Sequence, residues 1–195
     1  MESLNQIADL IADSVSVKEA LLASKDIHER IAQSANSWVT TLKEDGKILF
    51  CGNGGSAADA QHIAAELSGR FYHDREPLFA EALHVNTSYL TAVANDYSYD
   101  EIYSRMIKAK GRKGDVLVGI STSGNSGNVV LALEEAKAKG MITIGMTGSK
   151  GGKMKDICDI LLNVPSDDTP RIQECHILIG HIICQLTEEK LFLNS

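Results

Sequence analysis

The sequence has few of the residues that interrupt or anchor a chain. Only three of its 195 residues are prolines, and no linker-like or low-complexity stretch divides it. No apolar run approaches the ~20 residues that a membrane-spanning helix needs. The first segment, MESLNQIADLIADS, is acidic and amphipathic and lacks the basic start of an export signal. These absences predict one domain over residues 1–195, located in the cytoplasm and not in a membrane.

Basic residues are in the minority, and the cysteines are scattered. Lys and Arg number 19 against 26 Asp and Glu, a formal net charge of -7, which argues against nucleic acid or an anionic membrane as a partner. The four cysteines form no C-x-x-C pair; they are Cys51, Cys158, Cys175 and Cys184. In a cytoplasmic chain they are expected to be reduced and buried as small apolar side chains.

Short apolar segments alternate with helical patterns along most of the chain. They predict strands at 47–51, 80–85, 115–120, 141–147 and 157–164. Near-continuous apolar strands separated by helices are typical of a parallel sheet covered on both faces, so the expected fold is a doubly wound, five-stranded α/β sheet. Residues 3 to about 44 read as two leading helices that we expect to pack across a subunit interface. The last helix is expected to have Thr169 as its N-cap and Pro170 at its first position.

The segment CGNGGSAADAQHIAAEL (51–67) begins as a glycine turn after a strand and continues as a helix. Residues 52–57 match a variant of the dinucleotide fingerprint. However, the next strand ends in His84-Val85-Asn86, without the acid that would hold a ribose. The turn is therefore either purely structural, or it presents bare N–H groups at a helix N-terminus to an anionic or polyhydroxyl ligand.

The segment GISTSGNSGN (119–128) is a second loop between a strand and a helix, and it is crowded with hydroxyls. One ordinary N-cap needs one hydroxyl, whereas this loop supplies Ser121, Thr122, Ser123 and Ser126. Hydroxyls donate to phosphate oxygens, and the N-terminal amides of the next helix point the same way. The loop therefore predicts a phosphate site that needs no Lys or Arg.

Two histidines have neighbours that suit a metal. His62 and Glu66 are four residues apart on one predicted helix and share a face, which suits two ligands to one ion. The same pair also reads as a surface histidine beside a surface glutamate. His181 lies in the apolar run ILIGHIICQL, where a buried core histidine is the alternative.

Both loops, together with VANDYSYDEIY and TPRIQECHILIGHIICQL, resemble the sugar isomerase (SIS) domain family, from about residue 30 to the C-terminus and in the same order. The resemblance is to members that act on seven-carbon sugar phosphates. It implies a flavodoxin-like or Rossmann-like αβα sandwich in which residues 1–195 form one SIS domain and residues 1–44 are oligomerisation helices. It also implies a homotetramer with its active sites at subunit interfaces.

The resemblance further implies one Zn²⁺ per subunit, with His62, Glu66, Gln173 and His181 as ligands. Gln173 and His181 are eight residues apart, about 12 Å along a helix axis. They can meet one ion only by leaning together or by coming from neighbouring subunits.

The same resemblance implies the residues that hold and convert the substrate. Glu66 would be the general base and His181 the general acid. Substrate contacts would come from Asn53, Gly54, Gly55, Ser56, Glu66, Asn95, Asp96, Ser121, Thr122, Ser123, Ser126 and Gln173. A plain helix-ending turn is the alternative for Asn95 and Asp96. Arg70 and Arg171 are candidates for charge balance or interface pairing, and Pro170 stands where some members carry an acid.

The implied reaction is the aldose–ketose isomerisation of sedoheptulose 7-phosphate to D-glycero-D-manno-heptose 7-phosphate through an enediolate. This would be the first step toward an ADP- or GDP-activated heptose for lipopolysaccharide core or capsule. Two alternatives remain. One is an isomerase of another sugar phosphate, and the other is a non-catalytic relative that binds a replication initiator.

Overall fold

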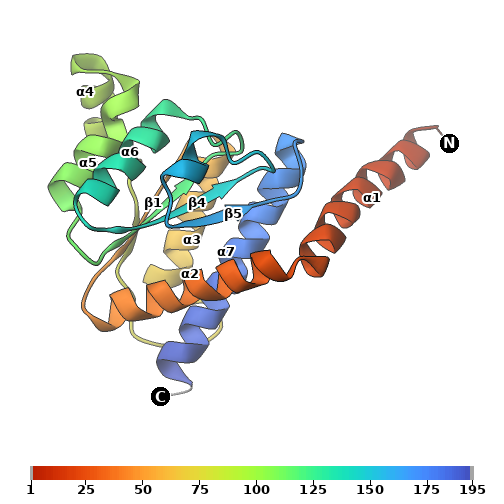
Figure 1. Ribbon diagram of the computed structural model, residues 1–195, viewed down its shortest axis with the longest axis horizontal. Helices are drawn as coiled ribbons and strands as arrows, with labels where there is room; N and C mark the ends of the chain where they lie inside the picture. The colour runs from red at the N-terminus through yellow and green to blue at the C-terminus, as the bar shows by residue number, and fades with distance from the viewer. Residues whose placement is uncertain (1, 194–195) are drawn as a thin grey trace.

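Five parallel strands form one sheet in the order β2-β1-β3-β4-β5. The computed structural model describes residues 2–193 (Figure 1). Its strands are β1 (Ile48–Gly52), β2 (Ala80–Ala82), β3 (Val116–Ile120), β4 (Ile142–Thr147) and β5 (Ile160–Asn163). The order is that of flavodoxin-like, doubly wound sheets. It confirms the predicted fold class.

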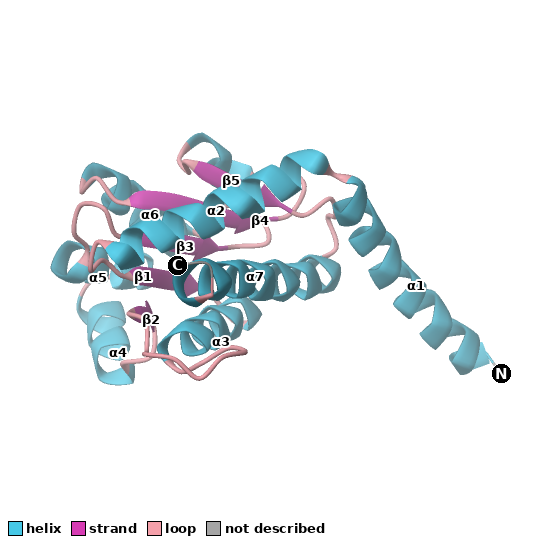
Figure 2. Ribbon diagram, turned by 90° about the horizontal axis from the view of Figure 1, so that it is seen from below, coloured by secondary structure: helices cyan, strands magenta, loops and turns pink. Residues whose placement is uncertain are grey.

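Helices cover both faces of this sheet (Figure 2). On one face lie α2 (Lys25–Lys43), α3 (Gly55–Ser68) and α7 (Thr169–Phe192), and on the other α4 (Thr87–Asp96), α5 (Ile102–Lys110) and α6 (Gly127–Ala138). Two 3-10 turns complete the fold, η1 (Tyr99–Glu101) and η2 (Gly152–Asp156). Strand side chains alternate between the two faces. Ile48 and Phe50 accordingly belong to one apolar core, and Leu49 and Cys51 to the other.

The two strands at the sheet edges are shorter than predicted. In β2 only Ala80–Ala82 pair with β1, and in β5 only Ile160–Asn163 pair with β4. An edge strand has a neighbour on one side only, so its apolar flanks turn into loops without breaking further pairing. The central strands β1 and β3 are buried along their whole length and match their predicted runs closely.

The leading helices α1 (Glu2–Ala23) and α2 differ in what they pack against. The helix α2 buries Ile27, Ile31 and Trp38 against the sheet. The helix α1 projects away from the body (Figures 1 and 2). Large apolar side chains lie exposed along it, namely Leu4, Ile7, Leu10, Ile11, Val15 and Leu22. Within residues 2–193, no helix is long and apolar enough to cross a membrane.

The start of α7 corrects one prediction. The N-cap is Asp168, whose backbone is extended (φ -89°, ψ 116°), and Thr169 is already helical. Pro170 lies in the first turn, where its missing N–H leaves no helical hydrogen bond unmade. The prediction of Thr169 as N-cap was therefore wrong by one residue.

Strand register brings the predicted loops to one edge of the sheet. Gly52 at the end of β1 is opposite Ile120 at the end of β3, and Ile120 is opposite Met146 of β4. Parallel strands that end at one level present their following loops side by side. The glycine turn and the hydroxyl loop, far apart in sequence, are therefore neighbours.

Candidate functional site

A pair of amide side chains joins the glycine turn to the hydroxyl loop. Asn53 Nδ2 donates to Asn128 Oδ1 over 2.9 Å, and Asn128 Nδ2 donates back to Asn53 Oδ1 over 2.9 Å. The Tyr99 hydroxyl donates to the same Asn53 oxygen over 3.2 Å. This leaves the backbone of residues 53–55, more than the Asn53 side chain, available to a ligand. Sequence reasoning missed Asn128 and Tyr99.

The hydroxyls of residues 121–126 bond to one another. Ser121 Oγ lies 2.8 Å from Ser126 Oγ and 3.4 Å from Ser123 Oγ. Ser126 occupies the N-cap of α6, yet its side chain makes no capping hydrogen bond. The first amides of α6 thus receive no hydrogen-bond acceptor from their N-cap side chain, which is an arrangement that accepts an anion.

A cavity of about 270 Å³ opens beside this loop at the carboxyl edge of the sheet. It is lined by Thr122, Ser123, Asn125, Gly148, Ser149, Lys150, Asp167, Thr169 and Ile172. Lys150 is paired with Asp167 over 3.1 Å, so its charge is largely balanced within the chain. The polar lining suits a phosphorylated, hydroxyl-rich molecule better than an apolar one.

Two glycines let α3 and α7 pack closely and parallel to each other. A Cβ on residue 55 would lie 2.6 Å from Gln173 Nε2, and a Cβ on residue 180 would lie 2.5 Å from Ile63 Cδ1. Contacts that advance in the same direction on both helices require a parallel pair. His62 and His181 flank the Gly180–Ile63 contact, and their Nε2 atoms lie 3.2 Å apart.

His62, Glu66 and His181 form a compact cluster on the outer side of that helix pair. His62 Nε2 lies 3.0 Å from Glu66 Oε1 and 3.2 Å from His181 Nε2. One ligand atom from each residue lies within 4.8 Å of the others. The His62 side chain is 49% exposed and that of Glu66 is 24% exposed, so the cluster is open to solvent or to a partner surface.

The cluster fits a zinc ion. Two imidazole nitrogens and one carboxylate oxygen are a donor set that zinc enzymes use, with the fourth position left for water or substrate. Three lone pairs directed at one region repel one another unless a proton or a cation lies between them. A divalent cation removes that repulsion for all three at once.

Asp59 lies one turn before His62 on α3. Its Oδ2 is buried and has no hydrogen-bond partner among the described residues. Burial raises the pKa of the Asp59 carboxyl, and nearby His62 partly opposes the rise. A cation bound at the cluster would lower the pKa of this carboxyl further, because a nearby positive charge favours the carboxylate.

Three other predicted site residues do not join the cluster. Gln173 lies against Gly55, about two turns of α7 before His181, so its role as a ligand stays a prediction. Asn95 and Asp96 end α4, and Asn95 Nδ2 donates to Asp96 Oδ1 over 2.9 Å. That bond is also what the alternative of a helix-ending turn predicts.

The arginine and cysteine candidates are accounted for differently. Arg171 pairs with Glu174 over 2.7 Å and donates to the Leu10 carbonyl, which ties α7 to α1. Arg70 is exposed.

All four cysteines are free, and burial raises the pKa of each thiol, to about 12 for Cys158. Protonated thiols are poor nucleophiles, in line with the predicted structural role.

Comparison with known proteins gives consistent matches over nearly the whole chain. A family model described as the SIS domain matches residues 11–148. The phosphoheptose isomerase of Aneurinibacillus thermoaerophilus is 53% identical over 185 residues, covering 95% of this chain and 93% of that protein.

Solved structures agree with the sequence relatives. The phosphoheptose isomerase of Neisseria gonorrhoeae superposes with a TM-score of 0.89 at 46% identity, covering 95% of this chain and 98% of that one. The enzyme from Francisella tularensis gives 0.92 at 38% identity, covering 97% and 100%. The chain therefore belongs to the SIS domain family of sugar isomerases. Within that family it belongs with the phosphoheptose isomerases.

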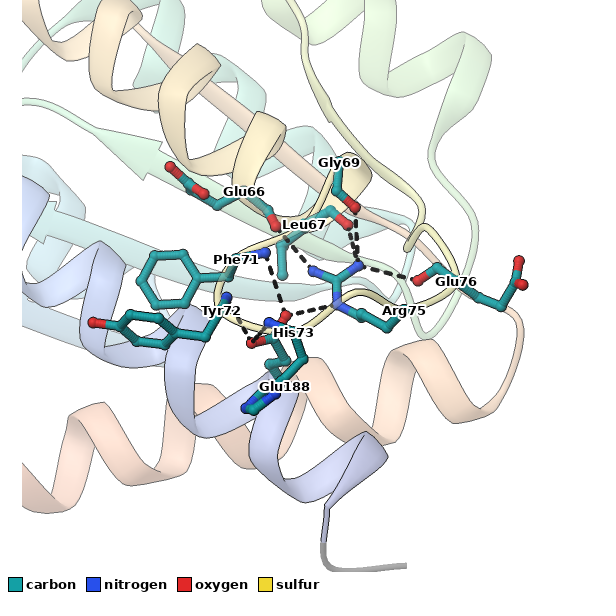
Figure 3. A network of polar contacts seen from close by, with 9 residues as sticks. All are labelled: Glu66, Leu67, Gly69, Phe71, Tyr72, His73, Arg75, Glu76 and Glu188. Carbon is teal, nitrogen blue, oxygen red and sulfur yellow. Dashed lines mark hydrogen bonds and ion pairs between the residues drawn. The ribbon is translucent and has the colours of Figure 1, made fainter.

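Sequence reasoning also missed a buried network at the C-terminal end of α3 (Figure 3). Arg75 and Glu188 lie 113 residues apart in sequence, yet Arg75 Nε donates to Glu188 Oε1 over 2.9 Å. Neither residue belongs to a recognisable motif. A charged residue late in an amphipathic helix normally reads as a solvated position, so no local signal marked Glu188.

Proposed function

We propose that this chain isomerises sedoheptulose 7-phosphate to D-glycero-D-manno-heptose 7-phosphate. The observation that supports this most strongly is the convergence of His62, Glu66 and His181 on neighbouring helices. One of those helices begins beside the hydroxyl loop. The relatives of this chain at about half sequence identity are phosphoheptose isomerases.

The hydroxyl loop would hold the 7-phosphate through Ser121, Thr122, Ser123 and Ser126 together with the first amides of α6. Ser121 and Ser126 already bond to each other, so their oxygens are positioned before a ligand arrives. The glycine turn, Asn53 to Ser56, would contact the sugar chain. Asn95 and Asp96 would bind further hydroxyls.

Glu66 would act as the general base and His181 as the general acid. Glu66 removes the proton from C1, next to the C2 ketone, and an enediolate forms. The proton then returns at C2, while His181 exchanges a proton with the substrate oxygens. The barrier comes chiefly from charge that develops on oxygen, which the cluster is placed to stabilise.

One zinc ion per subunit would be bound by His62, Glu66, Gln173 and His181. When bound, it polarises the substrate oxygens as a Lewis acid. Glu66 would alternate between ligand and base, because a carboxylate held by a cation is a weaker base than a free one.

We also propose a homotetramer with active sites at subunit interfaces. What supports it is that Leu4, Ile7, Leu10, Ile11, Val15 and Leu22 lie exposed along α1, which projects from the body. In such an assembly residues 1–195 would form one SIS domain, with the leading helices at the interfaces. The product would feed an ADP- or GDP-activated heptose for lipopolysaccharide core or capsule, made in the cytoplasm.

A direct assay tests the activity. Sedoheptulose 7-phosphate is incubated with the protein, with and without a zinc chelator, and the aldose signal is followed by NMR. Conversion that the chelator abolishes and added zinc restores is the expected result. No conversion in either condition would overturn the proposal and favour either an isomerase of another sugar phosphate or a binding protein.

A further inference from the structure

A buried ion pair lies at the far end of the helix pair that carries the cluster. The side chains of Arg75 and Glu188 are only 3% and 1% exposed. Arg75 follows α3 in a loop without regular structure, and Glu188 is on α7 (Figure 3). Removing two charges from water is expensive, and a buried pair often adds no net stability over apolar residues of similar volume. The presence of this buried pair therefore suggests that it serves to fix the positions of the groups around it.

Glu188 holds the loop that follows α3 by its backbone. The carboxylate accepts three successive N–H groups, from Phe71 over 3.3 Å, Tyr72 over 2.9 Å and His73 over 3.2 Å. Burial alone would raise the pKa of Glu188, but these N–H groups and the Arg75 guanidinium outweigh it and lower the pKa. The group is thus an anion with a fixed set of donors.

Arg75 holds the end of α3. Its Nη2 donates to the Glu66 carbonyl over 2.9 Å, and its Nη1 donates to the carbonyls of Leu67 over 2.9 Å and Gly69 over 3.3 Å. The last carbonyls of a helix have no partner within it, so the planar guanidinium closes the helix end. One of these carbonyls belongs to Glu66 itself.

The ion pair is connected to His181 in two ways, through helix α7 and through the Phe71 ring. Glu188 follows His181 by seven residues on α7, two turns along the same face. The Phe71 ring, whose backbone Glu188 holds, lies 5.7 Å from the His181 ring between centroids. The His181 ring in turn lies 5.0 Å from that of His62.

We propose that Arg75 and Glu188 are positioning residues for the candidate site, which set Glu66 through its backbone and His181 through Phe71. The inference rests on the proposed function, because it assigns these residues to that same site. It requires a planar, forked cation at position 75. A lysine could pair with Glu188, but it could not also donate to the Glu66 and Leu67 carbonyls.

Two variants and a matched control test the proposal. The variants are Glu188→Gln and Arg75→Lys. The control is Asp115→Asn, because Asp115 is also a buried carboxylate that accepts two backbone N–H groups, from Lys47 and Arg112, and pairs with Lys47 Nζ over 2.6 Å. None of those partners lies on α3, on α7 or in the loop that follows α3. The midpoint of thermal unfolding, kcat, KM and the zinc dissociation constant are measured for each, the last by competition with a chromophoric chelator.

Both variants are expected to lower kcat about 10- to 100-fold and to weaken zinc binding by a similar factor, the range seen for residues that orient metal ligands. KM should stay within about 3-fold of the wild-type value, since the hydroxyl loop is untouched. Asp115→Asn should lower the unfolding midpoint as much as Glu188→Gln does, while leaving kcat and zinc affinity near wild type.

The proposal is overturned if the two variants and the control lose only stability. If Glu188→Gln does not fold, Arg75→Lys decides alone, because it keeps the buried charge. Wild-type kcat and zinc affinity in Arg75→Lys would show that the charge at position 75 matters and its forked geometry does not. That result would also overturn the proposal. If the wild type proves inactive on the heptose substrate, the proposed function fails. The zinc measurements still decide whether the pair orients the cluster.

Discussion

The hydroxyl loop and the His62–Glu66–His181 cluster are built by different means. The loop is one contiguous run whose hydroxyls bond to each other and whose backbone is set by strand β3 and helix α6. The cluster takes its side chains from two helices, and their approach depends on Gly180 and Ile63. Damage to the loop should therefore appear in KM, and damage to the cluster in kcat and metal affinity.

Glu66→Gln should show the largest effect. Amide replaces carboxylate with almost no change in shape, so proton abstraction is lost while the substrate can still bind. We expect kcat to fall by at least about 10³-fold, near the upper range for a general base. Steady-state kinetics measures this, and calorimetric titration with the substrate shows whether binding survives.

The matched control is Glu134→Gln, which makes the same chemical change at an exposed position on α6. It should leave kcat unchanged. Near-normal turnover in the Glu66 variant would remove Glu66 from the role of base.

Gly180→Ala should separate the cluster without altering any of its three members. The added methyl would meet Ile63 Cδ1 at 2.5 Å and Cγ1 at 2.8 Å, so either the Ile63 side chain or the two helices must shift, and we expect α3 and α7 to move apart. Overpacking of this kind costs about 1–3 kcal/mol of stability. Zinc affinity and kcat should both fall about 10-fold, as chelator competition and kinetics would show.

A second substitution, at Ile63, tests whether the added methyl of Gly180→Ala acts through this contact. Adding Ile63→Val removes the Cδ1 contact and leaves the longer one to Cγ1, so it should restore part of both zinc affinity and kcat. If Gly180→Ala weakened neither property, close helix packing would not be what forms the cluster.

Ser121→Ala should affect binding alone. The hydroxyl is nearly buried and bonds to Ser126, so its loss removes one donor to the phosphate and loosens another. A hydrogen bond to a charged group contributes about 1.5–3 kcal/mol, which predicts a rise in KM of at least about 10-fold. The value of kcat should change by less than about 3-fold. Ser37→Ala is the control, at a half-buried position on α2 whose hydroxyl bonds to the Gln33 carbonyl. An effect of Ser121→Ala on kcat as large as its effect on KM would contradict the separation of binding from catalysis.

The smallest predicted effect concerns His176, whose replacement should change the pH dependence of folding stability and leave the candidate site unchanged. It is fully buried on α7, its Nε2 donates to the Thr147 carbonyl, and Nδ1 has no partner among the described residues. Burial lowers its pKa from 6.5 to about 4, and the Thr147 bond opposes part of that change. Between those two values the unfolded chain binds a proton that the folded chain does not. The contribution of a neutral His176 to stability is therefore complete above pH 6.5 and declines as the pH falls toward 4.

The decline cannot exceed about 1.4 kcal/mol per pH unit, or about 2 kcal/mol between pH 6.5 and 5. His176→Gln keeps a donor for Thr147 and removes the titration. Urea unfolding of the metal-free protein at pH 7 and at pH 5 should show a smaller loss for the variant than for the wild type. Equal losses would mean that His176 does not stay neutral in the fold.

Much of the fold was predictable because its signals are local. Apolar runs placed the central strands β1 and β3 within about one residue, since a strand buried on both faces tolerates almost no polar side chain. The edge strands were predicted too long because pairing, and not apolar character, decides where a strand ends. The N-cap of α7 was misplaced by one residue because Asp168 and Thr169 are both favourable at that position.

The sequence by itself determined the class of sheet, the hydroxyl loop and, through resemblance, the residue types of the site. Each of these depends on neighbours within a few positions or on motifs kept in order. Only the tertiary structure decided that α3 and α7 run parallel in close contact, that His62 and His181 meet, and that Arg75 and Glu188 form a buried ion pair. The physical reason is that packing between helices depends on surface shape and on missing Cβ atoms, which no single segment of sequence records.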